Sequence, residues 1–282
     1  MTMKRIKFLF AVIVFGLSTS AQDLQVMTFN IRYNNAGDSL NAWPYRKDKV
    51  VSQLLFHDVQ LLGVQEALHN QMMDLKALLP KFKSVGVGRD GGEKGEYSAI
   101  FYDSTRLQAL ASQTFWLSLT PDVVASKSWD AALTRIVTWI KFKDRKTGKT
   151  FFHFNTHFDH VGKVARRESA KLLLEKVAGI SGKLPAIVTG DFNAFPTDEP
   201  IQVIMDKTNT LHLIDSKEIS ATPHYGPIGT FNGFGPKERE ERPIDYIFLK
   251  GTWKVKKHAS ISQTWMGRFA SDHFAVLATI GY

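Results

Sequence analysis

Polar side chains of the kinds used in hydrolytic catalysis stand where short apolar segments of this chain begin or end. An amide, a carboxylate and a histidine each close one such segment, and an acid followed closely by an amide closes another. A further acid opens a segment, and an Asp-His pair directly precedes the last one. Side chains at strand ends converge at one edge of a sheet, where ligand sites form. The residues are Asn30, Glu66, His157, Asp191, Asn193, Asp245, Asp272 and His273.

Hydrolysis of a phosphoester accounts for the acids and the first amide. A hard cation such as Mg²⁺ prefers carboxylate and amide oxygens, which Glu66, Asp272 and Asn30 offer. The attacking water needs a base and alignment for in-line displacement. Either Asp191 or His273 can fill that role, and the sequence leaves the choice open.

The remaining polar residues fit the charge that develops during the reaction. His157 and Asn193 can donate hydrogen bonds to the non-bridging phosphate oxygens. An acid bonded to the far nitrogen of a catalytic histidine fixes its tautomer and stabilises the imidazolium. We expect Asp245 to do this for His273, and we place Asp272 on the metal side because adjacent strand residues point to opposite faces.

Each of these residues also has a structural interpretation. A lone Asn or Asp at a strand end is usually a turn former, and a lone Glu there is most often a solvated loop residue or a helix cap. Asp245 could pair with the neighbouring Arg242, and Asp272 could be a simple cap. The functional hypothesis therefore rests on the whole ordered set and not on any one member.

The elements that must position these residues are short strands alternating with amphipathic helices. Segments 135–142 and 150–156 form a hairpin about the turn 146–148, so the sheet arrangement cannot be purely parallel. We predict an α/β fold, a four-layer sandwich of two packed mixed sheets flanked by helices. Predicted strands are 24–31, 58–65, 98–102, 135–142, 150–156, 186–189, 245–249 and 274–280, and predicted helices are 45–56, 71–79 and 166–178.

The chain begins with the three parts of a secretory signal. Lys4, Arg5 and Lys7 precede a short apolar run and the small residues 18–21. We predict a signal peptide over 1–21, cleaved after Ala21, and one catalytic domain over 22–282. This makes the protein exported, periplasmic or secreted, without a stable membrane anchor, and we expect a monomer. The chain has no cysteine, which excludes disulfides and thiolate metal sites, and its formal net charge of +9 suits an anionic substrate.

The ordered set of polar residues, from Asn30 to His273, resembles the pattern of the endonuclease/exonuclease/phosphatase superfamily. The resemblance spans 24–280 and implies the four-layer sandwich and a divalent cation, Mg²⁺ or Mn²⁺. It implies that Glu66 is the main metal ligand, helped by Asn30 and Asp272. It also implies that Asp191 orients or deprotonates water, that Asn193 and His157 hold phosphate, and that Asp245 pairs with His273.

Other stretches resemble a branch of exported bacterial members, among them Asn30-Ile31-Arg32-Tyr33 and Gly95-Glu96-Tyr97-Ser98. We expect these stretches to form the rim of the pocket. Guanidinium groups match phosphate oxygens, although each arginine could equally pair with a structural carboxylate. The candidate substrate contacts are Arg89, Tyr97, Arg135, His160 and Arg166.

The predicted function is therefore an exported, metal-dependent phosphoester hydrolase, with a phosphodiesterase as the first expectation. A phosphomonoesterase acting on phosphosugars or inositol phosphates is the alternative, and a catalytically silent anion-binding protein is another. Nucleic acid, phosphosugar, inositol phosphate and lipid headgroup all remain open as the anionic substrate. Trp116, Trp129 and 231–234 could stack on bases or pack on the scaffold.

Overall fold

The computed structural model describes residues 23–235 and 242–282, so the predicted signal peptide over 1–21 lies outside the described residues. Along the chain, short 3-10 turns, helices and strands alternate. The elements are β1 (Leu24–Asn30), η1 (Ala36–Asn41), η2 (Trp43–Tyr45), α1 (Lys47–Phe56), β2 (Leu61–Ala67), α2 (His69–Leu78), β3 (Phe82–Val85), β4 (Tyr97–Asp103), β5 (Leu107–Trp116), β6 (Ile136–Asp144), β7 (Thr150–His157), α3 (Lys163–Ser181), β8 (Ala186–Asp191), α4 (Glu199–Met205), β9 (Ile214–Asp215), β10 (Asp245–Lys250), β11 (Lys254–Ile261), β12 (Thr264–Trp265), β13 (Arg268–Phe269) and β14 (Ala275–Gly281).

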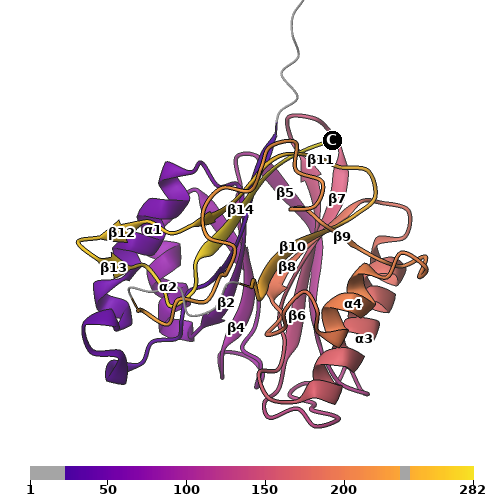
Figure 1. Cartoon of the computed structure of the whole chain (residues 1–282), viewed down its shortest axis with the longest axis horizontal. Helices are drawn as coiled ribbons and strands as arrows, with labels where there is room; N and C mark the ends of the chain where they lie inside the picture. The colour runs from indigo at the N-terminus through magenta and orange to yellow at the C-terminus, as the bar shows by residue number, and fades with distance from the viewer. Residues whose placement is uncertain (1–22, 236–241) are drawn as a thin grey trace, which may run out of the picture.

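Two six-stranded mixed sheets face each other at the centre of the molecule (Figure 1). The first sheet has the strand order β11-β14-β1-β2-β4-β3, and the second has the order β5-β6-β7-β8-β10-β9. Helices α1 and α2 cover the outer face of the first sheet, and α3 and α4 cover the outer face of the second (Figure 1). The predicted four-layer α/β sandwich is confirmed, as is the hairpin of β6 and β7.

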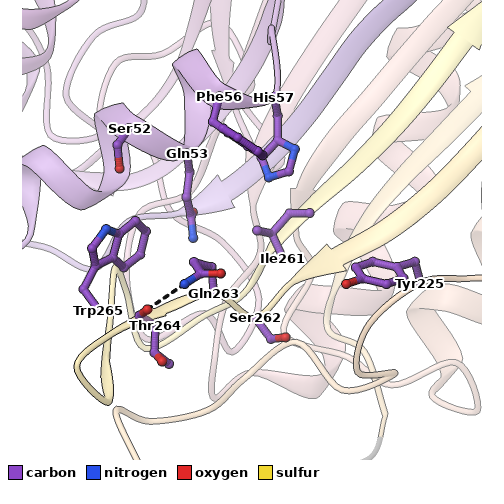
Figure 2. A pocket seen from close by; sticks show the side chains of 10 residues that line it. All are labelled: Ser52, Gln53, Phe56, His57, Tyr225, Ile261, Ser262, Gln263, Thr264 and Trp265. Carbon is purple, nitrogen blue, oxygen red and sulfur yellow. Dashed lines mark hydrogen bonds between the residues drawn. The ribbon is translucent and has the colours of Figure 1, made fainter.

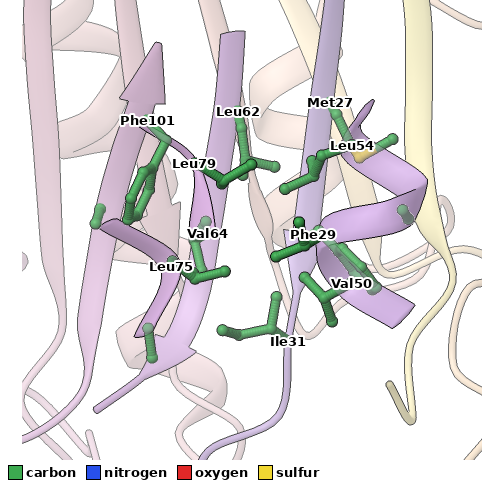
Figure 3. Packing of buried hydrophobic residues seen from close by; sticks show 14 of the residues in the cluster. Met27, Phe29, Ile31, Val50, Leu54, Leu62, Val64, Leu75, Leu79 and Phe101 are labelled. Atoms are coloured by element: carbon green, nitrogen blue, oxygen red, sulfur yellow. The ribbon is translucent and has the colours of Figure 1, made fainter. Parts of the chain in front are cut away.

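The alternation of side chains along β1 shows why the sequence forms this sandwich. Met27, Phe29 and Ile31 point outward and pack with Val50 and Leu54 of α1 (Figure 3). On the opposite face, the apolar side chains of the same strand lie between the sheets. A strand that is apolar on both faces is buried on both, and each fully buried aliphatic or aromatic side chain contributes about 1.5–3 kcal/mol.

The layer between the sheets changes from apolar to polar along the strands. In β7 the residues at spacing two are Phe151, His153, Asn155 and His157, all buried. At mid-layer Gln65 donates to Asn155 Oδ1 at 2.6 Å, and the Asn155 side-chain amide donates to backbone carbonyls of the first sheet. These hydrogen bonds link the two sheets directly beneath the edge where the strands end.

Gly63 of β2 is required by this close approach of the sheets. A Cβ atom at Gly63 would lie 2.2 Å from Thr189 Oγ1 and 2.4 Å from Asn155 Oδ1. Such contacts are far shorter than the packing of an interior allows. The glycine therefore lets the inter-sheet hydrogen bonds form.

Several elements differ from those predicted from the sequence. The helix predicted over 45–56 begins only at Lys47, because Pro44 lies in the separate 3-10 turn Trp43–Tyr45. The strand predicted from residue 58 begins at Leu61, since Asp58 takes a positive φ of 48° in the preceding turn. The edge strands β5 and β11 were missed because their exposed middles lack a continuous apolar pattern. Within 23–235 and 242–282, no helix is long and apolar enough to cross a membrane.

Candidate active site

Strand directions bring the predicted polar residues to one edge. Strands β1 and β2 run parallel, as do β7 and β8, so their last residues lie at the same edge. Strands β10 and β14 run antiparallel to β8 and β1, so their first residues reach that edge too. A cleft of about 650 Å³, called the polar cleft below, opens there. It is lined by Arg32, Tyr33, Glu66, Arg89, Glu96, Leu133, Arg135, His157, His160, Asp191, Asn193, Phe231, Ile244, Asp272 and His273.

His273 and Asp245 form a buried pair at the floor of the polar cleft. Nδ1 of His273 lies 2.9 Å from Asp245 Oδ2, and the backbone N–H of Asp245 donates to Thr230 Oγ1 at 3.2 Å. Burial lowers the pKa of His273, but the carboxylates of Asp245, Asp191 and Asp272 outweigh this and raise it well above its usual value. The ring therefore carries a positive charge at neutral pH.

Asp191 lies at the centre of the site. Its Oδ2 accepts from Asn30 Nδ2 at 2.9 Å and lies 3.5 Å from His157 Nε2 and 3.8 Å from His273 Nε2. Burial, reinforced by the nearby carboxylate of Asp245, raises the pKa of Asp191 to about 7. A carboxyl group with such a pKa can exchange a proton near neutral pH, as a general base or acid must.

His157 and Asn193 form a second bonded pair on the wall from β7 and β8. Burial, with the positive charge of Arg135, lowers the pKa of His157 well below its usual value, so its ring is neutral. Asn193 Nδ2 lies 3.0 Å from His157 Nε2 and also donates to Phe158 O. An amide N–H can only donate, so Nε2 accepts and the ring proton resides on Nδ1, a tautomer assigned from this network.

Glu66 and Asp272 face each other across Arg32. The guanidinium of Arg32 lies 4.0 Å from Glu66 Oε2 and 3.8 Å from Asp272 Oδ2, while it bonds Asp38 at 3.0 Å. Burial first, and then repulsion from Glu66, raise the pKa of Asp272 against the opposing effect of His273. The two acids therefore form an anionic pocket whose charge the guanidinium of Arg32 partly neutralises.

Asn30 connects the two sides of the site. Its Nδ2 donates to Glu66 Oε1 at 3.0 Å and to Asp191, and its Oδ1 accepts from the backbone N–H of Arg32. In this orientation the amide oxygen faces the backbone. A ligand role for Asn30 would require its side-chain amide to turn over, whereas a positioning role needs no change.

The Asp272-His273 pair does not lie within the last strand. The alternation of adjacent strand residues between opposite faces was therefore the wrong reason for giving the two residues different roles. β14 begins at Ala275, and the pair sits in the segment before it. Backbone N–H groups of Asn232 and Gly233 donate to Asp272 O at 2.8 and 3.0 Å. The two side chains still diverge, with Asp272 on the side of Arg32 and His273 on the side of Asp245.

Unusual backbone conformations cluster at the site. Arg32, Glu66 and Asn193 have positive φ angles of 56°, 63° and 46°. A non-glycine residue in this region costs about 1–3 kcal/mol and persists only where the surroundings enforce it. At Glu66 the pairing of β2 with β4 shifts register between Val64 and Ala67, which turns this carboxylate toward the cleft.

Three of the five predicted substrate contacts line the polar cleft. Arg89 pairs with Glu96 at 2.6 Å, Arg135 lies 4.0 Å from the same acid, and Arg135 Nη2 lies 3.1 Å from His160 Nδ1. Nε of Arg89 and Nε of Arg135 are buried without a hydrogen-bond partner among the described residues. Both arginines line the cleft, and each has one buried N–H group whose hydrogen-bonding capacity is unused by the described residues.

The other two predicted contacts lie outside the polar cleft, although Tyr97 lines a small neighbouring pocket together with Arg89 and Arg135. Neither Tyr97 nor Arg166 is among the described residues that line the polar cleft. The hydroxyl of Tyr97 lies 3.4 Å from Gly92 O and 3.3 Å from His69 Nδ1. Arg166 donates from Nη1 to Asp159 O at 3.0 Å. Their contacts support loops that border the cleft.

The site residues predicted from the sequence did not include several side chains that line the polar cleft. Arg32, Glu96 and Phe231 line it, and each lies in a stretch that the sequence analysis singled out. Arg46 was also missed. Its buried guanidinium donates to the carbonyls of Ile31 and Ala270 at 2.8 Å and so fixes two segments of the site to each other. No motif in the sequence marks Arg46 for that role.

The donor set fits a divalent cation. Ligand atoms of Asp191, Asp245 and His273 lie within 4.8 Å of one another, and Oδ1 of Asp245 is buried without a hydrogen-bond partner among the described residues. Asp245 and His273 are already bonded to each other, however, whereas Glu66 and Asp272 present carboxylate oxygens to the cleft. Oxygen donors of this kind suit a hard ion such as Mg²⁺.

The comparisons with known proteins agree with this geometry. The sequence profile of the Endonuclease/Exonuclease/phosphatase family matches residues 27–273, and the chain belongs to that family. It is thereby placed in a class of enzymes that hydrolyse phosphoesters. Protein angel of Drosophila melanogaster is 26% identical over 220 residues, which cover 73% of this chain and 58% of that protein.

Solved structures of similar proteins extend over nearly the whole chain. An endonuclease/exonuclease/phosphatase of Bacteroides vulgatus is 43% identical, with a TM-score of 0.87, covering 92% of this chain and 98% of that one. A mannosyl-6-phosphatase of Bacteroides thetaiotaomicron is 39% identical, with a TM-score of 0.87, covering 92% and 100%. The human Nocturnin catalytic domain shares the fold at 20% identity, with a TM-score of 0.72, covering 92% and 94%.

Proposed function

We propose that this protein is a divalent-metal-dependent phosphatase that removes phosphate from a phosphorylated sugar. The observation that carries the proposal is the polar cleft, in which the Asp245–His273 pair, Asp191 and the Glu66–Asp272 pocket converge. The sugar follows from the 39% identity with a mannosyl-6-phosphatase along 100% of that chain. The cleft of about 650 Å³ falls within the usual range for small-molecule sites.

Glu66 and Asp272 would hold the cation, with Asn30 keeping Glu66 in place. Mg²⁺ is our proposed ion, with Mn²⁺ as the alternative, because the donors are oxygens. The bound cation would supply a positive charge for the phosphate oxygens. Arg32 lies within 4.0 Å of both carboxylates and would limit their repulsion before the cation arrives.

The remaining groups of the chain would handle the water and its proton. Asp191, with its pKa near 7, would orient the attacking water and accept a proton from it while the bond between phosphorus and the sugar oxygen breaks. The departing sugar oxygen would take a proton from solvent, and Asp191 would later return its own proton to solvent. His273, held by Asp245, would remain an imidazolium beside the phosphate and stabilise its charge. His157 would donate from Nδ1 to a non-bridging oxygen, since its Nε2 already accepts from Asn193.

The charge around the cleft also suits a terminal phosphate. A phosphate monoester carries up to two negative charges, and arginine binds phosphate oxygens with paired N–H groups. Arg89 and Arg135 each keep a buried Nε without a partner among the described residues, and Glu96 holds the pair together. These two side chains are our proposed phosphate or sugar-phosphate contacts, with His160 beside them.

A phosphodiesterase, the first expectation from the sequence, is the second candidate. The apolar side chains of Leu133, Phe231 and Ile244 line the same cleft. They offer a surface for the group on the far side of a diester, which a monoester lacks. The two candidate activities would use the same metal and the same proton-transfer groups. They differ in whether the phosphate still carries an ester group after cleavage.

A substrate screen separates the candidates. Purified protein would be given hexose 6-phosphates, inositol phosphates, an aryl phosphodiester and single-stranded DNA, with Mg²⁺ or with a chelator. We expect phosphate release from hexose 6-phosphates that stops on chelation. Faster cleavage of a diester would favour the second candidate. Binding of these anions without any turnover would instead show a silent anion-binding protein.

We also propose that the protein is exported, on the strength of the basic, apolar and small-residue segments over 1–21. Amino-terminal sequencing of the protein recovered from its native host tests this. We expect a mature chain that begins at Gln22. An intact amino terminus recovered from the cytosol would contradict the proposal.

A further inference from the structure

A second cleft of about 630 Å³ lies on the flank of the first sheet, between α1 and the segment that follows β11 (Figure 2). We call it the aromatic cleft. It shares none of its described lining residues with the polar cleft. It is lined by Ser52, Gln53, Phe56, His57, Tyr225, Ile261, Ser262, Gln263, Thr264 and Trp265.

Gln53 is the feature of the aromatic cleft that packing does not explain. The residue is only 5% exposed, and its Oε1 is buried without a hydrogen-bond partner among the described residues. Figure 2 shows its side chain directed into the cleft, toward Gln263. A buried carbonyl oxygen without a partner costs about 1–3 kcal/mol, and a donating ligand would recover that cost once the Gln53 amide turns its oxygen toward the cleft.

Aromatic rings surround this amide. Phe56 is 83% exposed and Tyr225 is 75% exposed, while Trp265 is half-buried against the core. They come from three segments that are distant in sequence and meet around the same space (Figure 2). Exposed aromatic side chains that gather at one concave site mark a binding surface rather than ordinary surface composition.

The aromatic cleft is uncharged. Among the described residues that line it there is no Asp, Glu, Lys or Arg. Burial, the larger influence, outweighs the acid of Asp58 and lowers the pKa of His57, so its ring is neutral at pH 7. A phosphate or another ion would find no opposite charge here and would lose its hydration. This lining therefore favours a neutral ligand over an ion.

We propose that the aromatic cleft binds a neutral saccharide. The hydroxyl groups of a sugar can exchange hydrogen bonds with Gln263 and Thr264, and they can donate to the oxygen of Gln53 once its side-chain amide turns over. The apolar faces of its rings can pack on Phe56, Tyr225 and Trp265, which present large apolar area with few rotatable bonds. Rings combined with amides and hydroxyls, and without charge, match a polyhydroxylated neutral molecule better than a lipid or an ionic peptide.

This inference goes beyond the proposed function, because the site would bind sugar that carries no phosphate. A binding assay in the background of His273→Ala keeps the two claims separate, since it requires no turnover. Short neutral oligosaccharides of mannose, galactose, glucose or N-acetylglucosamine would be titrated calorimetrically. We expect at least one of them to bind this protein.

Three variants identify the site. Tyr225→Ala and Gln53→Leu should each weaken binding about tenfold, which corresponds to about 1.4 kcal/mol. Tyr45→Ala is the matched control, because Tyr45 is 60% exposed and lies outside the described lining of either cleft. It should leave the affinity unchanged.

Gln53→Leu also separates a binding role from a structural one. Replacing a buried carbonyl that has no partner with an apolar group of similar size should leave the melting temperature unchanged or raise it. The proposal is overturned if no oligosaccharide binds, or if Tyr225→Ala binds as tightly as the parent. It is also overturned if Tyr225→Ala dissociates a dimer, which would show that a second copy of the chain covers this surface.

Discussion

The polar cleft and the aromatic cleft have nearly equal volumes, about 650 Å³ and about 630 Å³, but they differ in almost every other property. The polar cleft is built where strands of both sheets end, and it contains both acids and arginines. The aromatic cleft lies on the flank of one sheet and, in the described part of the chain, has no charged lining residue. Their volumes alone would not distinguish their roles.

The difference lies in how the polar atoms are used. In the polar cleft, Asn30, Asp245 and Asn193 bond to the groups proposed to act on the substrate, so geometry is fixed before binding. In the aromatic cleft, Gln53 keeps an oxygen without a partner among the described residues. Charged groups held in fixed positions suit catalysis. An amide without a partner, placed among aromatic rings, suits the binding of a ligand.

The largest expected effect is loss of turnover in Asp191→Asn. The amide cannot accept a proton from water, so kcat should fall by a factor of roughly 10² to 10⁴. The matched control is Asp215→Asn, another buried acid with a raised pKa, which lies outside the described lining of the polar cleft. Steady-state kinetics with both variants test this, and equal losses would remove the special role of Asp191.

The pH dependence of turnover should distinguish the two possible bases. If Asp191 must lose its proton, kcat rises about tenfold per pH unit below a midpoint near 7 and then levels off. If His273 is the base, the midpoint follows its pKa, which the carboxylates raise well above 6.5, and the rise of kcat with pH should persist in Asp191→Asn. Saccharide binding at the aromatic cleft should stay constant above pH 7, where His57 is neutral and no other described lining residue carries a charge.

Glu66→Gln should act on metal binding. Loss of the carboxylate charge should raise the Mg²⁺ concentration needed for half-maximal activity about tenfold or more. The rise in melting temperature on adding Mg²⁺ should shrink accordingly, since only folded protein binds the ion. A variant with an unchanged Mg²⁺ requirement would show that the ligands are the Asp191, Asp245 and His273 group instead.

The smallest expected effect is that of Tyr225→Ala on catalysis. Turnover of a small aryl phosphate should match that of the parent, because Tyr225 lies outside the described lining of the polar cleft. On a phosphorylated glycan that reaches both clefts, Tyr225→Ala should have a higher KM than the parent and an unchanged kcat. Loss of turnover on the small substrate would mean that the two clefts are not independent.

Local chemistry along the chain was enough to predict the sheet sandwich and which polar residues meet at one edge of it. Strands buried on both faces have continuous apolar patterns, so β1, β2, β7 and β8 could be recognised. The polar residue at each end then marks the edge. This information is contained in neighbouring residues, so the sequence alone is enough to predict these features.

The missed features depend on long-range contacts. Arg32 reaches Glu66 and Asp272 only because its φ is positive, and Arg46 bonds carbonyls far along the chain. The aromatic cleft joins segments around Phe56, Tyr225 and Trp265, none of which has a motif. Such sites arise from packing, and a sequence pattern does not record them.

A double-mutant cycle of His273→Ala and Asp245→Asn tests most directly that the edge shared by both sheets is the catalytic centre. The two side chains bond at 2.9 Å and should act as one unit. Phosphate release from hexose 6-phosphates with Mg²⁺ would be measured for the parent, both single variants and the double variant. We predict that the double variant is no slower than His273→Ala alone. If the losses of the two single variants multiply in the double variant, or if His273→Ala is as fast as the parent, this edge is not the catalytic centre.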